Sequence, residues 1–398
     1  MSSSADLEHR WSYRRARVTR EFGQQFGGVP SVWVRAPGRV DLMGSHTDYN
    51  LGCVLTVAID RDTWIAATPR ADGCARVFSS NLQQLARFEV ATAAAGERNW
   101  DRYVRGVVAV LEREGFRSPG FDAVVHGTLP LASGLSSSAS LTVATGKLVE
   151  ELGGHEIDPL RLARLCQRAE NEVVGVPCGV LDPCSSILGR AGHAMLLDCR
   201  NLECDHRHVS EELTVVVADT RVARELATSK YGERRAECEE GVRQLSRPLP
   251  GVTSLRDVDR DRFERHRSQL PPHIARRCSF VIEEHGRVRP MAEALERGDR
   301  KRIRELCEHS FAGARDEYEI CVPAMEAMFA ALSETPGGVG ARQAGAGFGG
   351  CLVAIVERGA VDAFMRDASR RFAAAWGQEG SLFEVQIAQG AGRVEERS

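Results

Sequence analysis

One segment, residues 130–140, constrains the fold of this chain more than any other. This serine loop reads Pro-Leu-Ala-Ser-Gly-Leu-Ser-Ser-Ser-Ala-Ser and lies between an apolar predicted strand, 121–126, and an apolar predicted helix, 139–152. Small residues let backbone N–H groups converge on one point, and the start of the following helix adds positive potential there. The loop therefore predicts an anion site, most often one for phosphate. A serine-rich N-cap is the alternative, but an N-cap needs one such residue and not a run.

Two further segments carry dense polar and glycine patterns. Residues 35–50 read Arg-Ala-Pro-Gly-Arg-Val-Asp-Leu-Met-Gly-Ser-His-Thr-Asp-Tyr-Asn, and residues 340–351 read Gly-Ala-Arg-Gln-Ala-Gly-Ala-Gly-Phe-Gly-Gly-Cys. With the serine loop they resemble, in order and spacing, the three motifs of the GHMP small-molecule kinases, and the first resembles the galactokinase signature. The likeness continues through 169–172, 176–182 and 192–200. Three motifs in register are a much more specific signal than any one alone.

The third segment also contains the Gly-x-Gly-x-x-Gly spacing of dinucleotide-binding folds. That fingerprint has to follow a strand and open a helix. Here the glycines precede a predicted strand, 352–356, and no βαβ pattern surrounds them. A glycine-rich loop that lets the backbone approach a substrate or phosphate fits this position better than a dehydrogenase does.

The resemblance implies an α+β fold of two domains with the active site in the interdomain cleft. We place the domains at residues 1–210 and 211–398. It also implies that the protein, with Mg²⁺, transfers the γ-phosphate of ATP to the anomeric hydroxyl of galactose or a close relative. Chemistry of this kind depends on positioning, metal and positive charge.

The same resemblance implies a residue for each catalytic part. Asp182 matches the aspartate that accepts the proton of the acceptor hydroxyl, and Arg39 matches the arginine beside it, which would keep Asp182 ionised. Glu170 matches the glutamate that shares Mg²⁺ with Ser138, the last serine of the run. Without the resemblance, Asp182 would be interpreted as a turn-capping aspartate and Glu170 as a solvated helix residue.

The resemblance also implies two sets of binding residues. The nucleotide side would be formed by a turn, a tryptophan and the serine loop: Ser79, Trp100, Gly134, Leu135, Ser136, Ser137, Ser138, Ala139 and Ser140. A tryptophan taken alone is more often part of a core. The sugar side would be formed by residues that contact hydroxyls: Ser45, His46, Asp48, Gly179, Asp182 and Tyr231. An aspartate accepts from two neighbouring hydroxyls, which distinguishes sugar epimers.

This sequence departs from the galactokinase pattern at several positions. Ser45 stands where a glutamate that accepts from the C6 hydroxyl of galactose is usual, Asp41 replaces asparagine, and Lys230 replaces an acidic or neutral residue. The change at Ser45 removes a charged acceptor worth about 1.5–3 kcal/mol. Galactose is the leading substrate, and galacturonate or a pentose such as arabinose is the alternative.

Two other functions are open to a chain of this kind. A sugar-sensing regulator binds sugar and ATP without catalysis, but the sensor-type change shortens the serine loop, and Ser138 and Ala139 are both present here. A homoserine- or mevalonate-type kinase would lack the His-Thr-Asp-Tyr segment at 46–49, which belongs to the sugar branch.

Composition sets further limits. The 398 residues suffice for two domains, and a net charge of -3 gives no basic field for a nucleic-acid partner. We expect no membrane segment, because no apolar run spans a bilayer and the N-terminus has no signal-peptide core. The twelve cysteines include no Cys-x-x-Cys pair, which favours reduced thiols in a cytoplasmic enzyme. We expect sugar and ATP as its partners, and a monomer with a homodimer as the alternative.

Hydrophobic periodicity predicts the elements around these motifs. Strands are expected at 32–36, 54–67, 75–78, 88–91, 121–126, 194–197, 213–218, 352–356 and 383–387. Helices are expected at 5–25, 100–114, 139–152, 229–246, 273–297, 299–313, 322–333 and 360–376, so the second half is mostly helical.

Overall fold

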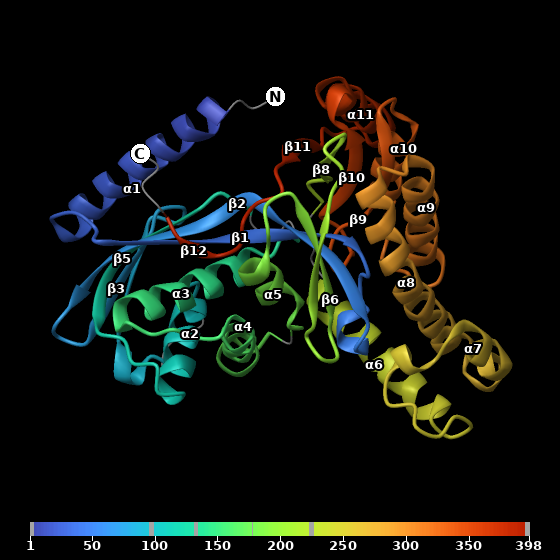
Figure 1. Cartoon of the computed structure of the whole chain (residues 1–398), viewed down its shortest axis with the longest axis horizontal. Helices are drawn as coiled ribbons and strands as arrows, with labels where there is room; N and C mark the ends of the chain where they lie inside the picture. The colour runs from blue at the N-terminus through green and yellow to red at the C-terminus, as the bar shows by residue number, and fades with distance from the viewer. Residues whose placement is uncertain (1–3, 95–98, 131–133, 177, 223–226, 395–398) are drawn as a thin grey trace.

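The computed structural model describes residues 4–94, 99–130, 134–176, 178–222 and 227–394. Their strands form two sheets with helices packed on both (Figure 1). The larger sheet consists of β1 (Val32–Met43), β2 (Cys53–Arg70), β3 (Cys74–Ser79), β4 (Gln84–Glu89), β5 (Gly120–Gly127), β6 (His193–Asp198), β7 (Cys204–His208) and β12 (Gly392–Arg393). The smaller sheet consists of β8 (Leu213–Asp219), β9 (Gly338–Gln343), β10 (Cys351–Glu357) and β11 (Ser381–Val385).

The long strand β2 organises the larger sheet. It pairs antiparallel with β1 along one side, and on its other side it pairs with β6 near its start and with β5 near its end. The sheet continues from β5 through its parallel neighbour β3 to β4, and β12 returns the C-terminal end of the chain to β1. The division into domains after residue 210 stays a prediction.

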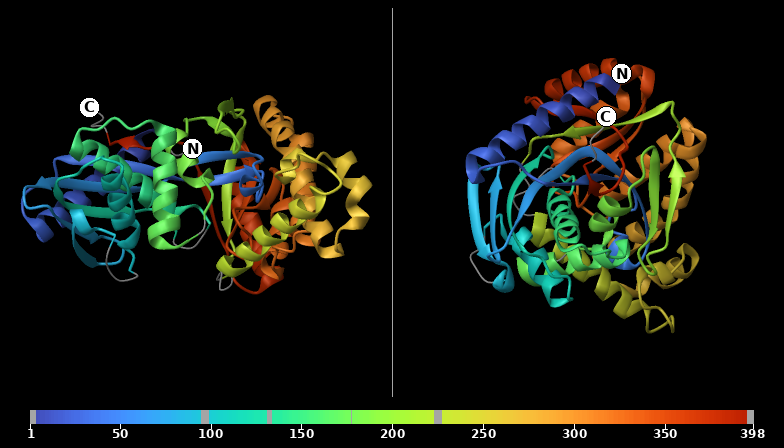
Figure 2. Two further views of the ribbon diagram at one scale, coloured as in Figure 1. Left: turned by 90° about the horizontal axis from the view of Figure 1, so that it is seen from below. Right: turned by 60° about the vertical axis from the view of Figure 1, so that its left-hand side comes forward.

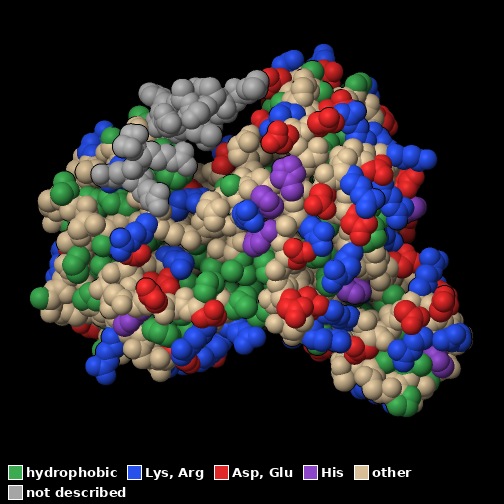
Figure 3. Space-filling view, in the orientation of Figure 1, with side chains coloured by type: hydrophobic (Ala, Val, Ile, Leu, Met, Phe, Trp, Pro, Cys, Tyr) green, Lys and Arg blue, Asp and Glu red, His purple; other side chains and the backbone are tan. Residues whose placement is uncertain are grey.

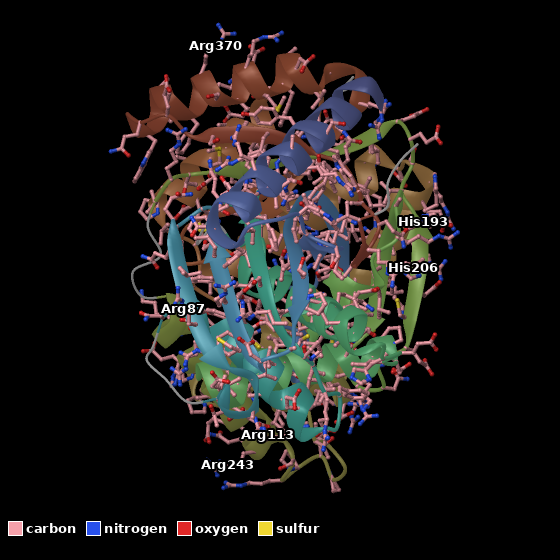
Figure 4. All side chains as sticks on the ribbon, turned by 90° about the vertical axis from the view of Figure 1, so that its left-hand side faces the viewer. Arg87, Arg113, His193, His206, Arg243 and Arg370 are labelled. Carbon is pink, nitrogen blue, oxygen red and sulfur yellow. The ribbon has the colours of Figure 1, made fainter. Side chains whose placement is uncertain are left out.

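Helices cover both faces of the larger sheet. On one face α1 (Ser4–Phe26) crosses the strands, in contact with β2 and β5 (Figure 4). The opposite face carries α2 (Arg102–Arg113), α3 (Ser137–Gly153), α4 (Pro159–Arg168), the π-helix η3 (Ala169–Val174) and α5 (Leu181–Leu188). Apolar side chains of these helices and of the strands form one core, which includes Val34, Phe121 and Val143. This core fixes the start of α3, and with it the end of the serine loop, over β1 and β2.

A buried ion-pair network anchors α1 to the sheet. Asp62 of β2 pairs with Arg14 of α1 and, at 2.8 Å, with Arg35 of β1, and it accepts a hydrogen bond from the indole of Trp64 at 3.1 Å. Burial raises the pKa of Asp62, but the two guanidinium groups outweigh burial and hold that pKa below its ordinary value. The carboxylate is therefore an ionised partner of two buried cations.

We expect Asp62→Asn to lower the free energy of unfolding by about 3–5 kcal/mol, because it leaves buried guanidinium groups without their carboxylate. Urea unfolding measures the loss. Asp72→Asn is the control, since Asp72 is an exposed partner of Arg70 in the following turn, and it should cost less than about 1 kcal/mol. Equally small losses in both variants would show that the network does not hold α1.

The second half of the chain is built mainly from helices. They are α6 (Ala227–Leu245), α7 (Arg260–His266), α8 (Pro272–Arg297), α9 (Arg300–Asp316), α10 (Pro323–Glu334) and α11 (Val361–Trp376) (Figure 2). α9 and α10 pack on β9, and α8 packs on α6, α9 and the first strands of the larger sheet. No helix of the described residues is long and apolar enough to cross a membrane. On the face shown in Figure 3, side chains of both charges are intermixed over both halves.

The two sheets share an apolar core. Val40 of β1 and Leu55 of β2 belong to the same buried cluster as Val217 of β8, Met291 of α8 and Val353 of β10. β1 therefore runs out of the core of the first half into contact with the second half. β1 ends at Met43, and the loop at 44–50 follows it. The first motif segment therefore lies beside the third motif segment.

Candidate active site

The three motif segments meet at one point. Arg39 of β1 donates from Nη1 to the carbonyl of Gly134 at 2.7 Å, and its backbone N–H donates to the carbonyl of Leu135 at 3.2 Å. A Cβ on Gly345 would stand 3.3 Å from the Gly134 carbonyl oxygen, and the φ of +66° at Gly345 favours glycine. A Cβ on Gly38 would stand 2.5 Å from the Leu135 carbonyl oxygen, so the close approach of the two segments requires glycine there.

Asp182 lies in the first turn of α5, against Arg39. Its Oδ1 accepts from Arg39 Nε at 2.8 Å and lies 2.7 Å from Nη2, and its Oδ2 accepts from the Ser136 hydroxyl at 2.6 Å. Burial lowers the pKa of Arg39, but the carboxylates of Asp182 and Asp41 outweigh burial, so that pKa is raised and Arg39 is a cation. A carboxylate oriented in this way can accept a proton from a hydroxyl that binds beside it.

A cavity of about 140 Å³ includes Asp182 in its wall. It lies between the two halves of the chain, and its wall is formed by Arg39, Asp41, His46, Asp48, Cys178, Gly179, Leu181, Asp182, Tyr231, Gly345 and Ala346. Six of these eleven residues have polar side chains, which suits a small ligand with several hydroxyl groups.

Asp48 and Gly179 pack against each other in the cavity wall. Asp48 begins the short 3-10 helix η1 (Asp48–Asn50). A Cβ on Gly179 would stand 2.2 Å from Asp48 Oδ2, which is far inside van der Waals contact, so Asp48 keeps its place only if residue 179 is glycine. Burial, followed by the negative charge of Asp182, raises the pKa of Asp48 to about 6.

A chain of hydrogen bonds fixes the ring of His46. Its Nε2 lies 3.1 Å from the Ala346 carbonyl, and its Nδ1 lies 2.9 Å from the Tyr49 hydroxyl, which lies 2.7 Å from the Tyr318 hydroxyl. Because a carbonyl only accepts, Nε2 carries the proton and Nδ1 accepts from Tyr49. Burial lowers the pKa of His46 to about 4, so the ring is neutral near pH 7.

Ser45 lies behind the cavity wall. Its hydroxyl accepts from Arg342 Nη2 at 3.1 Å, and the same nitrogen pairs at 2.7 Å with Glu284 of α8. Glu284 also accepts from the backbone N–H of Gly44 at 3.0 Å, so this buried pair supports the loop of the first motif from below. The contact of Ser45 with a substrate stays a prediction, because its hydroxyl is engaged here and other residues form the cavity wall.

Tyr231 and Lys230 are neighbours on α6, but their side chains have different surroundings. The ring of Tyr231 is in the cavity wall, with its centroid 5.5 Å from that of His46. The ammonium group of Lys230 lies 5.4 Å from the centroid of the Phe348 ring. Lys230 is therefore held over an aromatic face outside the cavity wall.

Comparisons with known proteins identify the family of this chain. Residues 20–69 match the galactokinase galactose-binding signature, 102–190 match the GHMP kinases N terminal domain, and 291–374 match the GHMP kinases C terminal model. A galactokinase of Roseiflexus sp. (strain RS-1) is 40% identical over 377 residues, which cover 95% of this chain and 96% of that relative. The chain belongs to the galactokinase branch of the GHMP kinases. Membership of this family makes it an ATP-dependent sugar kinase.

Solved structures of other kinases have the same fold as this chain. A Lactococcus lactis galactokinase complexed with galactose is 30% identical, with a TM-score of 0.91 over 94% of this chain and 98% of that one. A Methanococcus jannaschii mevalonate kinase shares the fold at 15% identity, with a TM-score of 0.65 over 90% of this chain and 98% of that one. The α+β fold expected from the sequence is thus confirmed.

In this GHMP kinase the serine loop leads into the N-terminus of α3. Ser136 has a left-handed φ of 59° just before the helix begins. Ser137 and Ser138 are partly exposed in the first turn, whereas Leu135 and Ala139 are buried. The N–H groups of that turn and the positive end of the helix suit a phosphate group. Residues 131–133 of the loop lie outside the described residues.

Three residues predicted on the nucleotide side have evident roles within the fold. Ser140 is fully buried, and its hydroxyl donates to the Ala36 carbonyl at 2.7 Å and accepts from the Thr63 N–H at 3.1 Å. The Ser79 hydroxyl accepts from the backbone of the turn after β3, and Trp100 packs against the core of the first half. Contacts of these three residues with ATP stay predictions.

Ser138 and Glu170 lie together, as the family resemblance implies. Glu170 is 3% exposed on the π-helix η3 and is hydrogen-bonded by the hydroxyls of Ser138 and, at 3.3 Å, of Thr142. Burial, followed by the charge of Asp182, raises the pKa of Glu170 to about 7. The described residues contain no group of three His, Cys, Asp or Glu side chains that forms a metal cage. One carboxylate and one hydroxyl fit a Mg²⁺ ion that takes its remaining ligands from phosphate oxygens and water.

Gly179→Ala is expected to raise the KM for the sugar about tenfold or more with a smaller effect on kcat, because the new methyl group displaces the Asp48 carboxylate. We predict that this carboxylate binds the sugar equally in the ground state and the transition state. Steady-state kinetics measure both constants. Gly359→Ala is the matched control, since a Cβ there meets no atom within 4 Å. A KM equal in the two variants would mean that Asp48 and Gly179 do not shape the sugar site.

Sequence reasoning missed the residues that support the site from behind. Glu284 and Tyr318 lie on helices or loops of the second half that carry no motif, and only the fold brings them to Gly44 and Tyr49. Arg342 is inside the third motif, so a charged residue in an otherwise glycine-rich, apolar segment was the available signal.

Proposed function

We propose that this protein is a galactose 1-kinase that transfers the γ-phosphate of ATP, with Mg²⁺, to the anomeric hydroxyl of galactose. The observation that carries the proposal is the place of Asp182, which lies in the wall of a polar cavity and is hydrogen-bonded by both Arg39 and the serine loop. The match to the galactose-binding signature and the relative complexed with galactose support the choice of sugar.

The positions of the side chains suggest a role for each. Asp182 accepts the proton of the sugar hydroxyl while that oxygen forms its bond to the γ-phosphorus and the bond from this phosphorus to the departing ADP breaks. Arg39 orients Asp182 and directs positive charge toward the transferred group. The backbone of the serine loop and the start of α3 bind phosphate oxygens. Ser138 and Glu170 would hold Mg²⁺, which when bound neutralises charge on the phosphates.

The sugar would be held by the cavity wall around Asp48. Its carboxylate accepts from neighbouring hydroxyls, and Gly179 leaves the space that this requires. Tyr231 and the neutral ring of His46 complete the wall on the side of the second half. Selectivity among sugar epimers then rests chiefly on Asp48. An ionised acceptor loses more binding free energy than a neutral one when the hydroxyl it binds is misplaced.

Sugar binding should weaken in acid. The pKa of Asp48 is raised to about 6, so its accepting form is lost as the pH falls through that value. We expect the KM for galactose to rise several-fold from about pH 7 to about pH 5, with a flat profile in Asp48→Asn. The same raised pKa makes ionised Asp48 unfavourable for folding, since the folded state retains its proton to higher pH than the unfolded state. This cost builds as the pH rises from the ordinary aspartate pKa and is complete above about pH 6. A galactose KM that does not change over this range would contradict the assignment.

A sugar panel tests the proposed function. Purified protein is incubated with ATP, Mg²⁺ and galactose, galacturonate or arabinose, and the phosphorylated position of each product is determined. We expect galactose 1-phosphate as the main product. ATP binding without any sugar phosphate would favour the sensor function instead, and a preference for galacturonate or arabinose would replace galactose as the substrate.

We also infer a monomer that acts in the cytoplasm, with domains at residues 1–210 and 211–398. All twelve cysteines are free thiols in the structure, which supports a reducing compartment. Cavity residues come from both halves, so one chain supplies a complete site without a second copy.

A further inference from the structure

The cavity wall carries more negative than positive charge. Among the described residues that form it, Arg39 is the one cation, whereas Asp41, Asp48 and Asp182 are all carboxylates. His46 adds no charge, because burial lowers its pKa to about 4. A ligand in this cavity therefore meets three acidic groups for one basic group.

Three cations close to the cavity interact with groups outside its wall. Arg342 pairs with Glu284 at 2.7 Å, and both side chains are at most 1% exposed. Arg234 donates to a backbone carbonyl at 2.7 Å and pairs with Glu237 at 2.9 Å. Lys230 lies over the Phe348 ring. None of these three cations forms part of the described cavity wall. Arg342 still acts on Asp41 from behind that wall, because it donates to the Asp41 carbonyl at 3.2 Å and its charge favours the ionised carboxylate.

Asp41 is the carboxylate that departs from the galactokinase pattern, in which asparagine is usual. It is 4% exposed on β1. Its Oδ1 lies 3.1 Å from Arg39 Nε, but that nitrogen donates at 2.8 Å to Asp182, and Asp41 Oδ1 receives no hydrogen bond from the described residues. One guanidinium group thus serves two carboxylates. Burial raises the pKa of Asp41 above its ordinary value, although the charges of Arg39 and Arg342 and a backbone hydrogen bond from Gly345 favour the ionised form.

We propose that Asp41 makes the sugar pocket select by charge: it disfavours galactose analogues that carry a carboxylate and favours analogues that carry an ammonium group. The inference rests on the proposed function, since it concerns the same pocket. In a small cavity of about 140 Å³, charges are screened less than in bulk water, so an added carboxylate is repelled and an ammonium group is attracted. Galacturonate is then a poor ligand even though Ser45 has replaced the usual glutamate.

The test compares the parent enzyme with Asp41→Asn, which keeps the side-chain volume and restores the residue usual in galactokinases. Galacturonate and galactosamine serve as competitors of galactose phosphorylation at about pH 7, where the carboxylate is ionised and the amine is largely protonated. Each inhibition constant is divided by the galactose KM, so that a general loss of sugar binding cancels. Asp205→Asn is the control, because it makes the same change in net charge at a side chain that is 54% exposed on β7.

We expect Asp41→Asn to improve the relative affinity for galacturonate about tenfold and to weaken that for galactosamine about as much, with no change in Asp205→Asn. A structural disturbance would move both ratios in the same direction. If the two ratios stay unchanged or move in the same direction while galactose is still phosphorylated, the charge-selection inference is wrong and the proposed function stands. A parent enzyme that does not phosphorylate galactose overturns the proposed function, and this inference with it.

Discussion

Asp182→Asn is expected to lower kcat about 100- to 10,000-fold, because the amide cannot accept the proton of the sugar hydroxyl. Asparagine keeps the volume of the side chain, and its oxygen can still accept from Arg39 or Ser136, so the cavity and the serine loop should persist. Pre-steady-state and steady-state assays with galactose measure the loss. Affinity for ATP and the melting temperature serve as controls and should change little.

A variant that kept more than about half of the parent kcat would remove Asp182 from the role of base. Loss of ATP affinity together with kcat would point instead to damage of the serine loop through the Ser136 hydrogen bond. The two results are distinguishable because nucleotide binding is measured without sugar.

Arg39→Ala is expected to lower kcat about 100- to 1,000-fold and also to destabilise the fold by about 3–5 kcal/mol. The rate falls because positive charge beside the transferred group and the orientation of Asp182 are both lost. The fold weakens because Asp41 and Asp182 lose their shared partner, and the Gly134 carbonyl loses its donor. Kinetics and urea unfolding measure the two effects separately.

The double variant Arg39→Ala with Asp41→Asn separates stability from catalysis. Removing the buried carboxylate should restore a large part of the lost unfolding free energy, while kcat stays as low as in Arg39→Ala. Recovery of kcat together with stability would show that Arg39 acts only as a structural ion-pair partner. Lack of any recovery in stability would show that the ion pair of Asp41 with Arg39 contributes little.

The fold was predictable where apolar periodicity is strong. The helix expected at 273–297 is α8 (Pro272–Arg297), and the one expected at 360–376 is α11 (Val361–Trp376). Strand β7 was not predicted because its sequence, Cys-Asp-His-Arg-His, has no apolar alternation. Its hairpin partner β6 begins at His193, which is labelled at the surface in Figure 4. β12 is only two residues long, and its pairing with β1 is a purely tertiary contact.

Three strands of the structure differ from the predicted ones. The first predicted strand ended at residue 36, but β1 continues through Pro37 and Gly38 to Met43, with a register shift against β2 that accommodates them. No strand was predicted at 338–343, yet this segment is β9, since pairing with β10 outweighs the weak strand preference of glycine. The strand expected at 88–91 is displaced, because β4 ends at Glu89.

The candidate site was predictable to the extent that motifs carry it. Arg39, Asp182 and Ser136 lie in three distant segments, and the structure brings their side chains within hydrogen-bond distance. The supporting pair of Arg342 and Glu284 was not predictable, because α8 carries no local signal for a partner under the first motif. Ser45 lies against this same pair, since its hydroxyl accepts from Arg342 at 3.1 Å, and no sequence pattern indicated that contact.

The destination of the phosphate is the most direct test of the central claim, that the cavity beside Asp182 presents a sugar hydroxyl to ATP. The measurement uses galactose with a heavy oxygen isotope at the anomeric position, ATP and Mg²⁺, and phosphorus NMR of the product. We predict galactose 1-phosphate with the label in the bridge between carbon and phosphorus. Phosphate on another hydroxyl, or ADP formed with inorganic phosphate alone, would contradict the account.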